Sequence, residues 1–82
     1  MGEIKKVDDF GATRYYNEIG QLHRDGDEPA VIWADGTKAW YQNSQRHRDG
    51  GKPAVIYPNG IEEYWVNGVR YHPQESKDKT PN

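Results

Sequence analysis

A tandem duplication constrains the fold of this chain more than any other feature of its sequence. Residues 23–46 and 47–70 align without gaps at a spacing of 24 residues and share eleven identical positions, and a partial copy covers residues 4–22. Because each copy has to adopt the same local structure and pack on its neighbour, we expect one domain of stacked units at residues 1–72. The polar segment 73–82 is predicted to be a flexible tail.

Each copy carries strand and turn signals and no helical periodicity. The β-branched and aromatic run at residues 30–33 precedes Asp35-Gly36, a dipeptide that favours a two-residue type I′ turn with positive φ at both central residues. Asn59-Gly60 holds the same place in the next copy. We therefore expect an all-β protein, an antiparallel meander of about six short strands formed by stacked 24-residue hairpin units. The strands are predicted at residues 4–7, 12–18, 29–33, 37–42, 53–57 and 61–66.

Aromatic rings have to supply much of the core. Leu, Ile, Val and Phe make up 12 of the 82 residues, whereas Phe, Tyr and Trp together number ten. Tyr16, Trp40 and Tyr64 recur at the repeat spacing, so they are predicted to form one aromatic column on the sheet. A single-layer sheet leaves apolar residues on both faces, which favours a partner, most simply a second copy of the chain.

The repeated unit resembles the MORN repeat, and more closely the variant MORN-like repeats of bacteria, bacteriophages and giant viruses. Residues 34–47 and 58–71 follow its pattern, in which a turn glycine is followed by an aromatic residue, an Asn-led turn and basic residues. Residues 23–30 and 47–54 read HRDGDEPA and HRDGGKPA, close to the tandem units of the viral members. The resemblance implies stacked MORN-like β-hairpins that act as a protein-binding platform, dimerise in some members and carry no catalytic residue; lipid contact is also proposed for the family.

Residue types that can carry catalysis are present, but their spacing does not suit it. The tripeptide His-Arg-Asp at residues 23–25 and 47–49 begins like a kinase catalytic loop, yet the chain is too short for a kinase and has no glycine-rich phosphate loop. The histidines of the two copies are expected about 10 Å apart, too far to share a metal ion. The chain has no cysteine to act as a nucleophile. We therefore predict a chain that is not an enzyme and has no catalytic residue, no metal site and no cofactor.

These features favour a non-enzymatic protein-binding module. Small size and the resemblance to phage-encoded repeats predict a small phage or mobile-element protein that binds a host protein and inhibits it by covering its surface. A CRISPR–Cas defence protein is one such target, which makes the chain an anti-CRISPR candidate. Trp, Tyr and Arg are enriched at the energetic centres of protein interfaces. The predicted partner-binding residues are Trp33, Trp40, Tyr41, Arg48, Tyr57 and Trp65.

Two other functions stay open. Cations interleaved with aromatic rings are typical of a surface that binds nucleic acid or another anionic surface, although the net charge is −2. A structural unit that self-associates, with a homodimer as the expected state, is the second. No apolar run is long enough to span a membrane, so we expect a cytoplasmic location, in the host cytoplasm for a phage protein. The residues predicted to bind nucleic acid or another anionic surface are Arg24, Arg46, His47, Arg48, Lys52 and Arg70.

Overall fold

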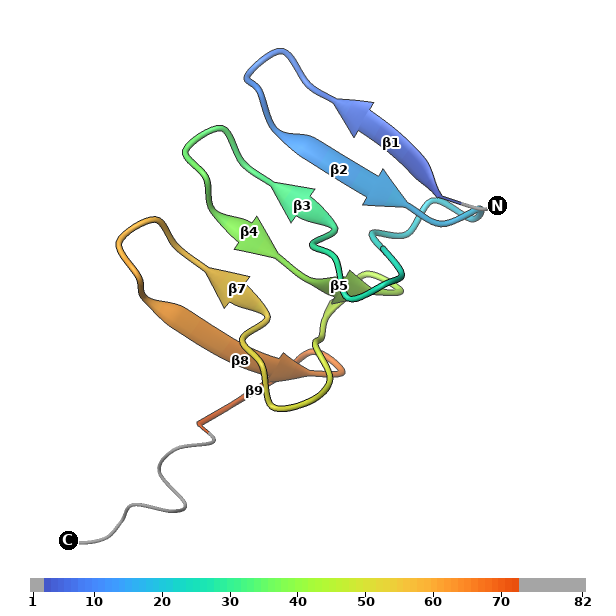
Figure 1. Cartoon of the computed structure of the whole chain (residues 1–82). Coiled ribbons are helices and arrows are strands. Elements are labelled where there is room, and N and C mark those ends of the chain that lie inside the picture. The colour runs from blue at the N-terminus through green and yellow to red at the C-terminus, as the bar shows by residue number, and fades with distance from the viewer. Residues whose placement is uncertain (1–2, 73–82) are drawn as a thin grey trace, which may run out of the picture.

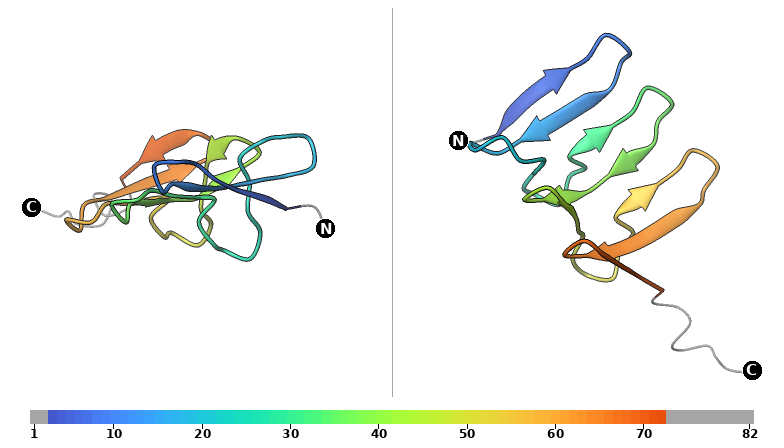
Figure 2. Two further views of the ribbon diagram at one scale, coloured as in Figure 1. Left: turned by 90° about the horizontal axis from the view of Figure 1, so that it is seen from above. Right: turned by 180° about the vertical axis from the view of Figure 1, so that it is seen from behind.

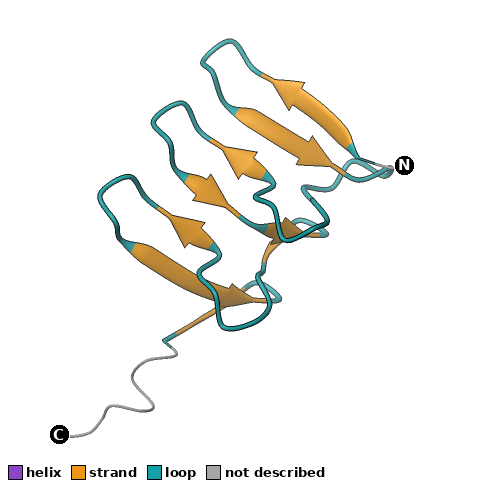
Figure 3. Ribbon diagram, viewed as in Figure 1, coloured by secondary structure: helices purple, strands orange, loops and turns teal. Residues whose placement is uncertain are grey.

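The computed structural model describes residues 3–72 and shows an all-β protein, as predicted. This part of the chain contains nine strands, all paired antiparallel, and no helix (Figures 1 and 3). One sheet has the order β1-β2-β3-β4-β7-β8-β9, and β5 pairs with β6. The predicted tail at residues 73–82 lies outside the described residues. The strands are β1 Ile4–Val7, β2 Thr13–Tyr16, β3 Val31–Ile32, β4 Lys38–Ala39, β5 Tyr41–Gln42, β6 Gln45–Arg46, β7 Val55–Ile56, β8 Glu62–Val66 and β9 Val69–Tyr71.

Three hairpins, β1–β2, β3–β4 and β7–β8, lie side by side in a row (Figure 1). The second and third use the same hydrogen bonds one repeat apart, because Ala30 N–H donates to Ala39 O and Ala54 N–H to Glu63 O, each at 2.8 Å. The second strand of one hairpin pairs with the first strand of the next, so that Ala39 also lies opposite Val55. The hairpins therefore form a continuous sheet that is a single layer thick.

The strands are shorter and more numerous than the sequence predicts. Trp40 divides the predicted strand 37–42 into β4 and β5, because its N–H donates to Ala54 O at 2.7 Å while its carbonyl accepts from His47 N–H at 3.1 Å. These two bonds connect Trp40 to two different segments instead of one ladder. The segments after the Asn-led turns, for which no strand is predicted, form the extra strands β6 and β9.

The prediction of a type I′ turn at Asp35-Gly36 is wrong. Trp33 N–H donates to Thr37 O and Gly36 N–H to Trp33 O, each at 2.9 Å, and Gly36 alone of the dipeptide has a positive φ, of 97°. The Asp35 carboxylate accepts Thr37 N–H at 2.8 Å, a local bond that competes with the type I′ conformation. The result is a three-residue loop closed by a left-handed glycine.

The φ signs of type I′ turns occur at the Asn-led turns instead. Asn43 and Ser44 have φ of 52° and 68°, and Asn67 and Gly68 have 51° and 81°. These turns and the strands that follow them lie over one side of the sheet (Figure 2, left). The connectors between hairpins, residues 23–30 and 47–54, lie on the other side (Figure 2, left). The prediction for Asn59-Gly60 is wrong for the same reason as for Asp35-Gly36, since Gly60 alone has a positive φ there.

The core is one thin cluster on the side of the Asn-led turns. Val31, Ala39 and Val55 lie opposite one another in neighbouring strands and are at most 2% exposed. Because the sheet has a single layer, the side chains that cover this cluster come from β8 of the same sheet, from β5 and from residues that flank the strands. The partly buried residues packed against it are Leu22, Trp33, Tyr41, Tyr57 and Trp65.

A second aromatic column lies on the opposite face and contains Tyr15, not the predicted Tyr16. The Arg24 guanidinium lies 3.8 Å from the centroid of the Tyr15 ring, and the Arg48 guanidinium lies 3.9 Å from that of Trp40. Tyr16 instead pairs with Leu22 on the face of the core. The partial copy has one extra residue, and a shift of one position moves a strand residue to the other face.

Candidate protein-interaction face

Four aromatic side chains gather on the face of the sheet that carries the core. Each follows a residue of the column Val31, Ala39, Val55 and Glu63 by two positions, and residues two apart in a strand share a face. All four pack against the buried cluster and are partly exposed, so they cover the core and also form surface. We call this surface the aromatic face, defined by Trp33, Tyr41, Tyr57 and Trp65 around Val31, Ala39 and Val55.

A hollow of about 290 Å³ opens on the aromatic face between Trp33 and Tyr57. Its base includes Val55, and a guanidinium, a hydroxyl and a carboxylate lie at its walls. An apolar base with a few polar groups around it is typical of a site that receives a side chain of a partner. The hollow is lined by Trp33, Asp35, Thr37, Arg46, Val55 and Tyr57.

Glu63 holds two of the rings in place. Its carboxylate accepts a hydrogen bond from Trp65 Nε1–H and another from the Tyr57 hydroxyl, each at 3.0 Å. The bond from Trp65, and after it the bond from Tyr57, lower the pKa of the Glu63 carboxyl below its ordinary value. The bond to Glu63 raises the pKa of the Tyr57 hydroxyl. Both rings are thus held by hydrogen bonds within the chain, and side chains that are already held lose less entropy on binding.

Arg46 adds a cation to the aromatic face. It lies opposite Tyr41 in the β5–β6 ladder, and its guanidinium is 5.1 Å from the Trp65 ring and 5.8 Å from the Tyr41 ring. Its buried Nε has no hydrogen-bond partner within residues 3–72. Arg70 lies opposite Trp65 in the next ladder and is exposed. Two cations therefore border the rings on the side of the Asn-led turns.

Trp40 and Arg48, also predicted to bind a partner, lie on the opposite face and are engaged within the chain. Trp40 is 7% exposed, and its Nε1–H donates to Asp27 O at 3.1 Å. The Arg48 guanidinium stacks on Trp40, donates to both carboxylate oxygens of Asp27 and donates to Pro53 O at 3.1 Å. Of the six predicted partner-binding residues, the structure thus brings four together on the aromatic face and places two elsewhere.

The six residues predicted to bind nucleic acid or another anionic surface are divided in the same way. Arg24 stacks on Tyr15 and donates to Pro29 O at 3.2 Å. His47 Nε2 lies 2.8 Å from an Asp49 carboxylate oxygen. Four of these six residues, namely Arg24, His47, Arg48 and Lys52, are bound to carbonyl or carboxylate oxygens, while Arg46 and Arg70 lie beside the aromatic face.

Asp27 joins the connectors of the two full copies. Arg48 Nε donates to it at 2.9 Å and Lys52 Nζ at 3.1 Å, and these bonds, that from Arg48 first, lower the pKa of the Asp27 carboxyl to about 2. A polar hollow of about 430 Å³ lies between the connectors. Because its cations and carboxylates already bind one another, the hollow offers a partner few free charges.

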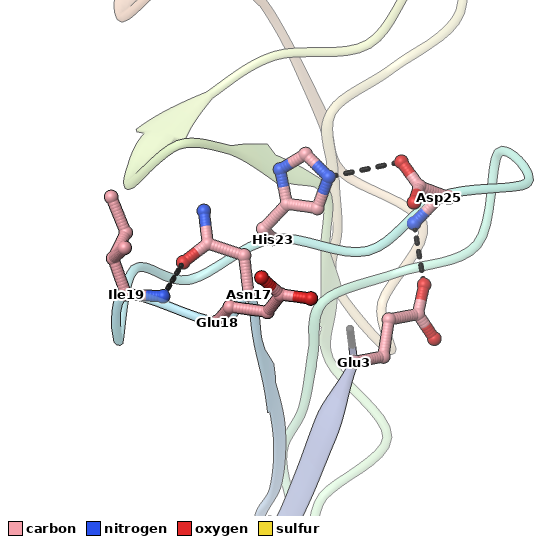
Figure 4. Close-up of a pocket in the computed structure, with 6 residues that line it drawn as sticks. All are labelled: Glu3, Asn17, Glu18, Ile19, His23 and Asp25. Carbon is pink, nitrogen blue, oxygen red and sulfur yellow. Dashed lines mark hydrogen bonds and ion pairs between the residues drawn. The ribbon is translucent and has the colours of Figure 1, made fainter. Parts of the chain in front are cut away.

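A third hollow lies beside the first connector (Figure 4). His23 Nε2 is 2.9 Å from an Asp25 carboxylate oxygen, and Asp25 N–H donates to a Glu3 carboxylate oxygen at 2.9 Å. Asn17 Oδ1 accepts Ile19 N–H at 3.1 Å, so His23, Asp25, Glu3 and Asn17 all make hydrogen bonds within this hollow. In residues 3–72 no three His, Asp or Glu side chains are grouped so that they could hold a metal ion.

Sequence reasoning did not single out Glu63, Asp35 or Thr37 as parts of the site. Glu63 carried a usable signal, because it stands where Ala39 stands in the preceding copy and lies two residues before Trp65. Asp35 and Thr37 carried none, since both were assigned to an ordinary hairpin loop and its return strand. Their place at the hollow depends on the three-residue geometry of that loop.

Comparisons with family models, with curated proteins and with solved structures found no match to this chain. Within residues 3–72, no helix is long and apolar enough to cross a bilayer. The function therefore has to be argued from the geometry of these side chains.

Proposed function

We propose that this chain is a non-enzymatic protein-binding module whose partner docks on the aromatic face. The observation that carries this proposal is the grouping of four partly exposed rings on one face of a single-layer sheet, where two of them, Trp33 and Tyr57, line a hollow. Large aromatic side chains of this kind supply most of the binding free energy in protein interfaces. A surface so thin and open suits contact with another protein better than chemistry that has to exclude water.

The composition of the face defines the partner. An apolar side chain of the partner fills the hollow between Trp33 and Tyr57, where the Glu63 hydrogen bond already fixes the Tyr57 ring. Acceptor groups of the partner, carbonyl or carboxylate oxygens, meet Arg46 and Arg70 at the border of the face. The partner surface is thus apolar at its centre and rich in acceptors on one side.

The resemblance to MORN-like repeats of bacteriophages supports a host protein as this partner. A chain of 82 residues acts most simply by covering a surface that the host protein needs. Inhibition of a CRISPR–Cas defence protein is the specific case, which makes the chain an anti-CRISPR candidate. That part of the proposal depends on the resemblance and not on the geometry.

Binding of nucleic acid through the six predicted basic residues is the weaker alternative. Four of the six candidate residues, including Arg24, Arg48 and Lys52, are bound to oxygens within the chain, so they are not free to bind phosphates. This alternative requires binding of single-stranded DNA that weakens steeply as the salt concentration rises. It also requires that the double substitution Arg24→Ala and Arg48→Ala abolish this binding.

The test is quantitative affinity capture from host lysate with the wild-type chain and with Trp33→Ala. We expect a stoichiometric protein that the wild type retains and that Trp33→Ala binds about ten-fold or more weakly, since loss of a central aromatic anchor costs at least that much. The affinity is then measured with the purified partner by titration calorimetry.

The matched control is Phe10→Ala, which removes an aromatic ring that is 85% exposed in the β1–β2 loop, away from the aromatic face. We expect it to bind the partner as the wild type does. Equal affinity of Trp33→Ala and the wild type for every captured protein contradicts the proposal.

A further inference from the structure

The two ends of the sheet carry opposite charges at positions that are apolar in its middle. On the aromatic face, directly opposed residues run across the strands in the order Lys6, Arg14, Val31, Ala39, Val55 and Glu63. The three central residues are the buried core. The first two positions are basic and the last is acidic, so β1 and β8 present complementary charges at opposite ends of the molecule.

The outer edge of β8 has an unfilled place for a strand. Inside the chain, Ala39 lies between Val31 and Val55, with a strand on each side. Glu63, one repeat later, lies opposite Val55 alone, because β9 begins to pair with β8 only at Tyr64. Within residues 3–72, the outer edge of 62–63 therefore pairs with no strand, and we call it the open edge.

The exposure of one residue in each hairpin loop indicates that, in the described part of the chain, β8 lacks a neighbouring hairpin on its outer side. The residue after the loop glycine is buried in the first two hairpins, where Ala12 is 4% and Thr37 is 7% exposed. Ile61 stands at the same place in the third hairpin and is 56% exposed. Neighbouring loops approach closely, since a Cβ on Gly11 would lie 3.2 Å from the Ala34 Cβ. A further hairpin beside β8 would cover an apolar side chain that now faces water.

We propose that the open edge of one copy pairs antiparallel with β1 of a second copy, which continues the sheet head to tail. In the register that Ala39 and Val55 use within the chain, Glu63 lies opposite Lys6 of the second copy and Glu62 opposite Val7 of the second copy. The first pair joins opposite charges directly across the strands, an arrangement that stabilises a sheet.

The opposite face supports the same register. There the first strands of the hairpins contribute Val7, Ile32 and Ile56, and these alternate across the sheet with the polar residues of the second strands. Those polar residues are Thr13, Lys38 and Glu62. Val7 of a second copy next to Glu62 continues this alternation without a break.

The charges also exclude a symmetric dimer through these edges. Pairing β1 with a second β1 places lysines beside lysines, and pairing the open edge with itself places glutamates beside glutamates. Head-to-tail contact joins two different surfaces, so each copy keeps one free end and oligomers grow beyond the dimer. This outcome differs from the closed homodimer that the sequence predicts.

The test is sedimentation velocity of the full chain at low ionic strength over a range of concentrations. We expect the weight-average mass of the wild type to rise past that of a dimer. Lys6→Glu and Glu63→Lys should each associate about ten-fold or more weakly, because each places like charges at the junction. An equimolar mixture of the two variants should recover association, since one carries Glu and the other Lys at both ends.

Two further variants separate edge pairing from loss of folding or change in net charge. Lys5→Glu makes the same charge change as Lys6→Glu on the neighbouring residue, whose side chain points to the other face, and should assemble as the wild type does. Val7→Pro keeps the charge but removes the backbone N–H of residue 7. Successive N–H groups of a strand point to opposite edges, and the N–H of Asp8 donates inward to Ala12 O at 2.9 Å. The N–H of Val7 therefore points to the outer edge of β1. The Val7→Pro variant should remain monomeric.

The proposal is overturned by a wild type that stays monomeric at every concentration. It is equally overturned by Lys6→Glu and Val7→Pro variants that assemble like the wild type. Assembly lost in Trp33→Ala but retained in these two variants would show contact through the aromatic face instead of the edges. That result would reject edge pairing and would identify a second copy as a protein that docks on the aromatic face.

Discussion

At the residue scale, Asp27 combines an unfavourable backbone conformation with a side chain that binds two cations. Its φ is 59°, in the left-handed region, and the next copy has Gly51 at the same place with φ of 71°. The Asp27 carboxylate binds Arg48 and Lys52 of the following connector. It thereby fixes the guanidinium that covers Trp40 and adds a side-chain link between two repeats that also pair through β4 and β7.

The pKa of Asp27 predicts a dependence of stability on pH. Its folded value of about 2 lies below the ordinary 3.8, so the folded state favours the ionised form. This contribution to stability is present above pH 3.8 and is lost as the pH falls through about 2. We expect the melting temperature of the wild type to fall between pH 4 and pH 2, and that of Asp27→Asn to fall less, as measured by circular dichroism.

Asp9→Asn is the control for this measurement, because Asp9 is an exposed carboxylate in the β1–β2 loop. Its melting temperature should follow the wild-type curve across the acidic range. Curves for Asp27→Asn and the wild type that run parallel from pH 7 to pH 2 would show that the ion pairs of Asp27 do not stabilise the fold.

At the scale of elements, the sequence predicts the positions of turns better than their types. Asp-Gly and Asn-Gly suit both a type I′ turn and a three-residue loop that ends in a left-handed glycine. The choice at residues 33–37 depends on the bond from Thr37 N–H to the Asp35 carboxylate, which composition alone does not reveal. The same loop type closes β1–β2 and β7–β8, where Gly11 and Gly60 have positive φ.

Gly36 provides a test of this loop geometry. Its φ is 97°. Apart from Gly36 and its two chain neighbours, no atom of the described residues lies within 4 Å of the position that an added Cβ would take, so Gly36→Ala meets a backbone cost and no clash with other residues. We expect it to lower the free energy of unfolding by about 1–2 kcal/mol, measured by urea denaturation. Ala34→Gly in the same loop, where φ is not positive, should cost less; equal losses would contradict the assignment.

At the scale of the whole molecule, the duplication was enough to predict an all-β antiparallel fold, but not the division of residues between faces. The four rings of the aromatic face were predicted as partner-binding residues together with Trp40, which is buried on the other side. The period of 24 also placed Tyr16 in the wrong column, because the partial copy has one extra residue. Face assignment needs the phase of every strand, and an insertion in a turn changes that phase without leaving a compositional trace.

A row of hairpins in which each contacts only its neighbours should be most stable in its middle. Trp40 N–H donates to Ala54 O at 2.7 Å and joins the second hairpin to the third. Asp8 N–H donates to Ala12 O at 2.9 Å within the first hairpin, whose strand β1 is exposed along its length. We expect amide hydrogen exchange, followed by NMR in dilute solution, to be about ten-fold or more slower at Trp40 than at Asp8. Equal rates at the two amides would mean that the sheet opens as a single cooperative unit, so that the end hairpins are as firmly held as the centre.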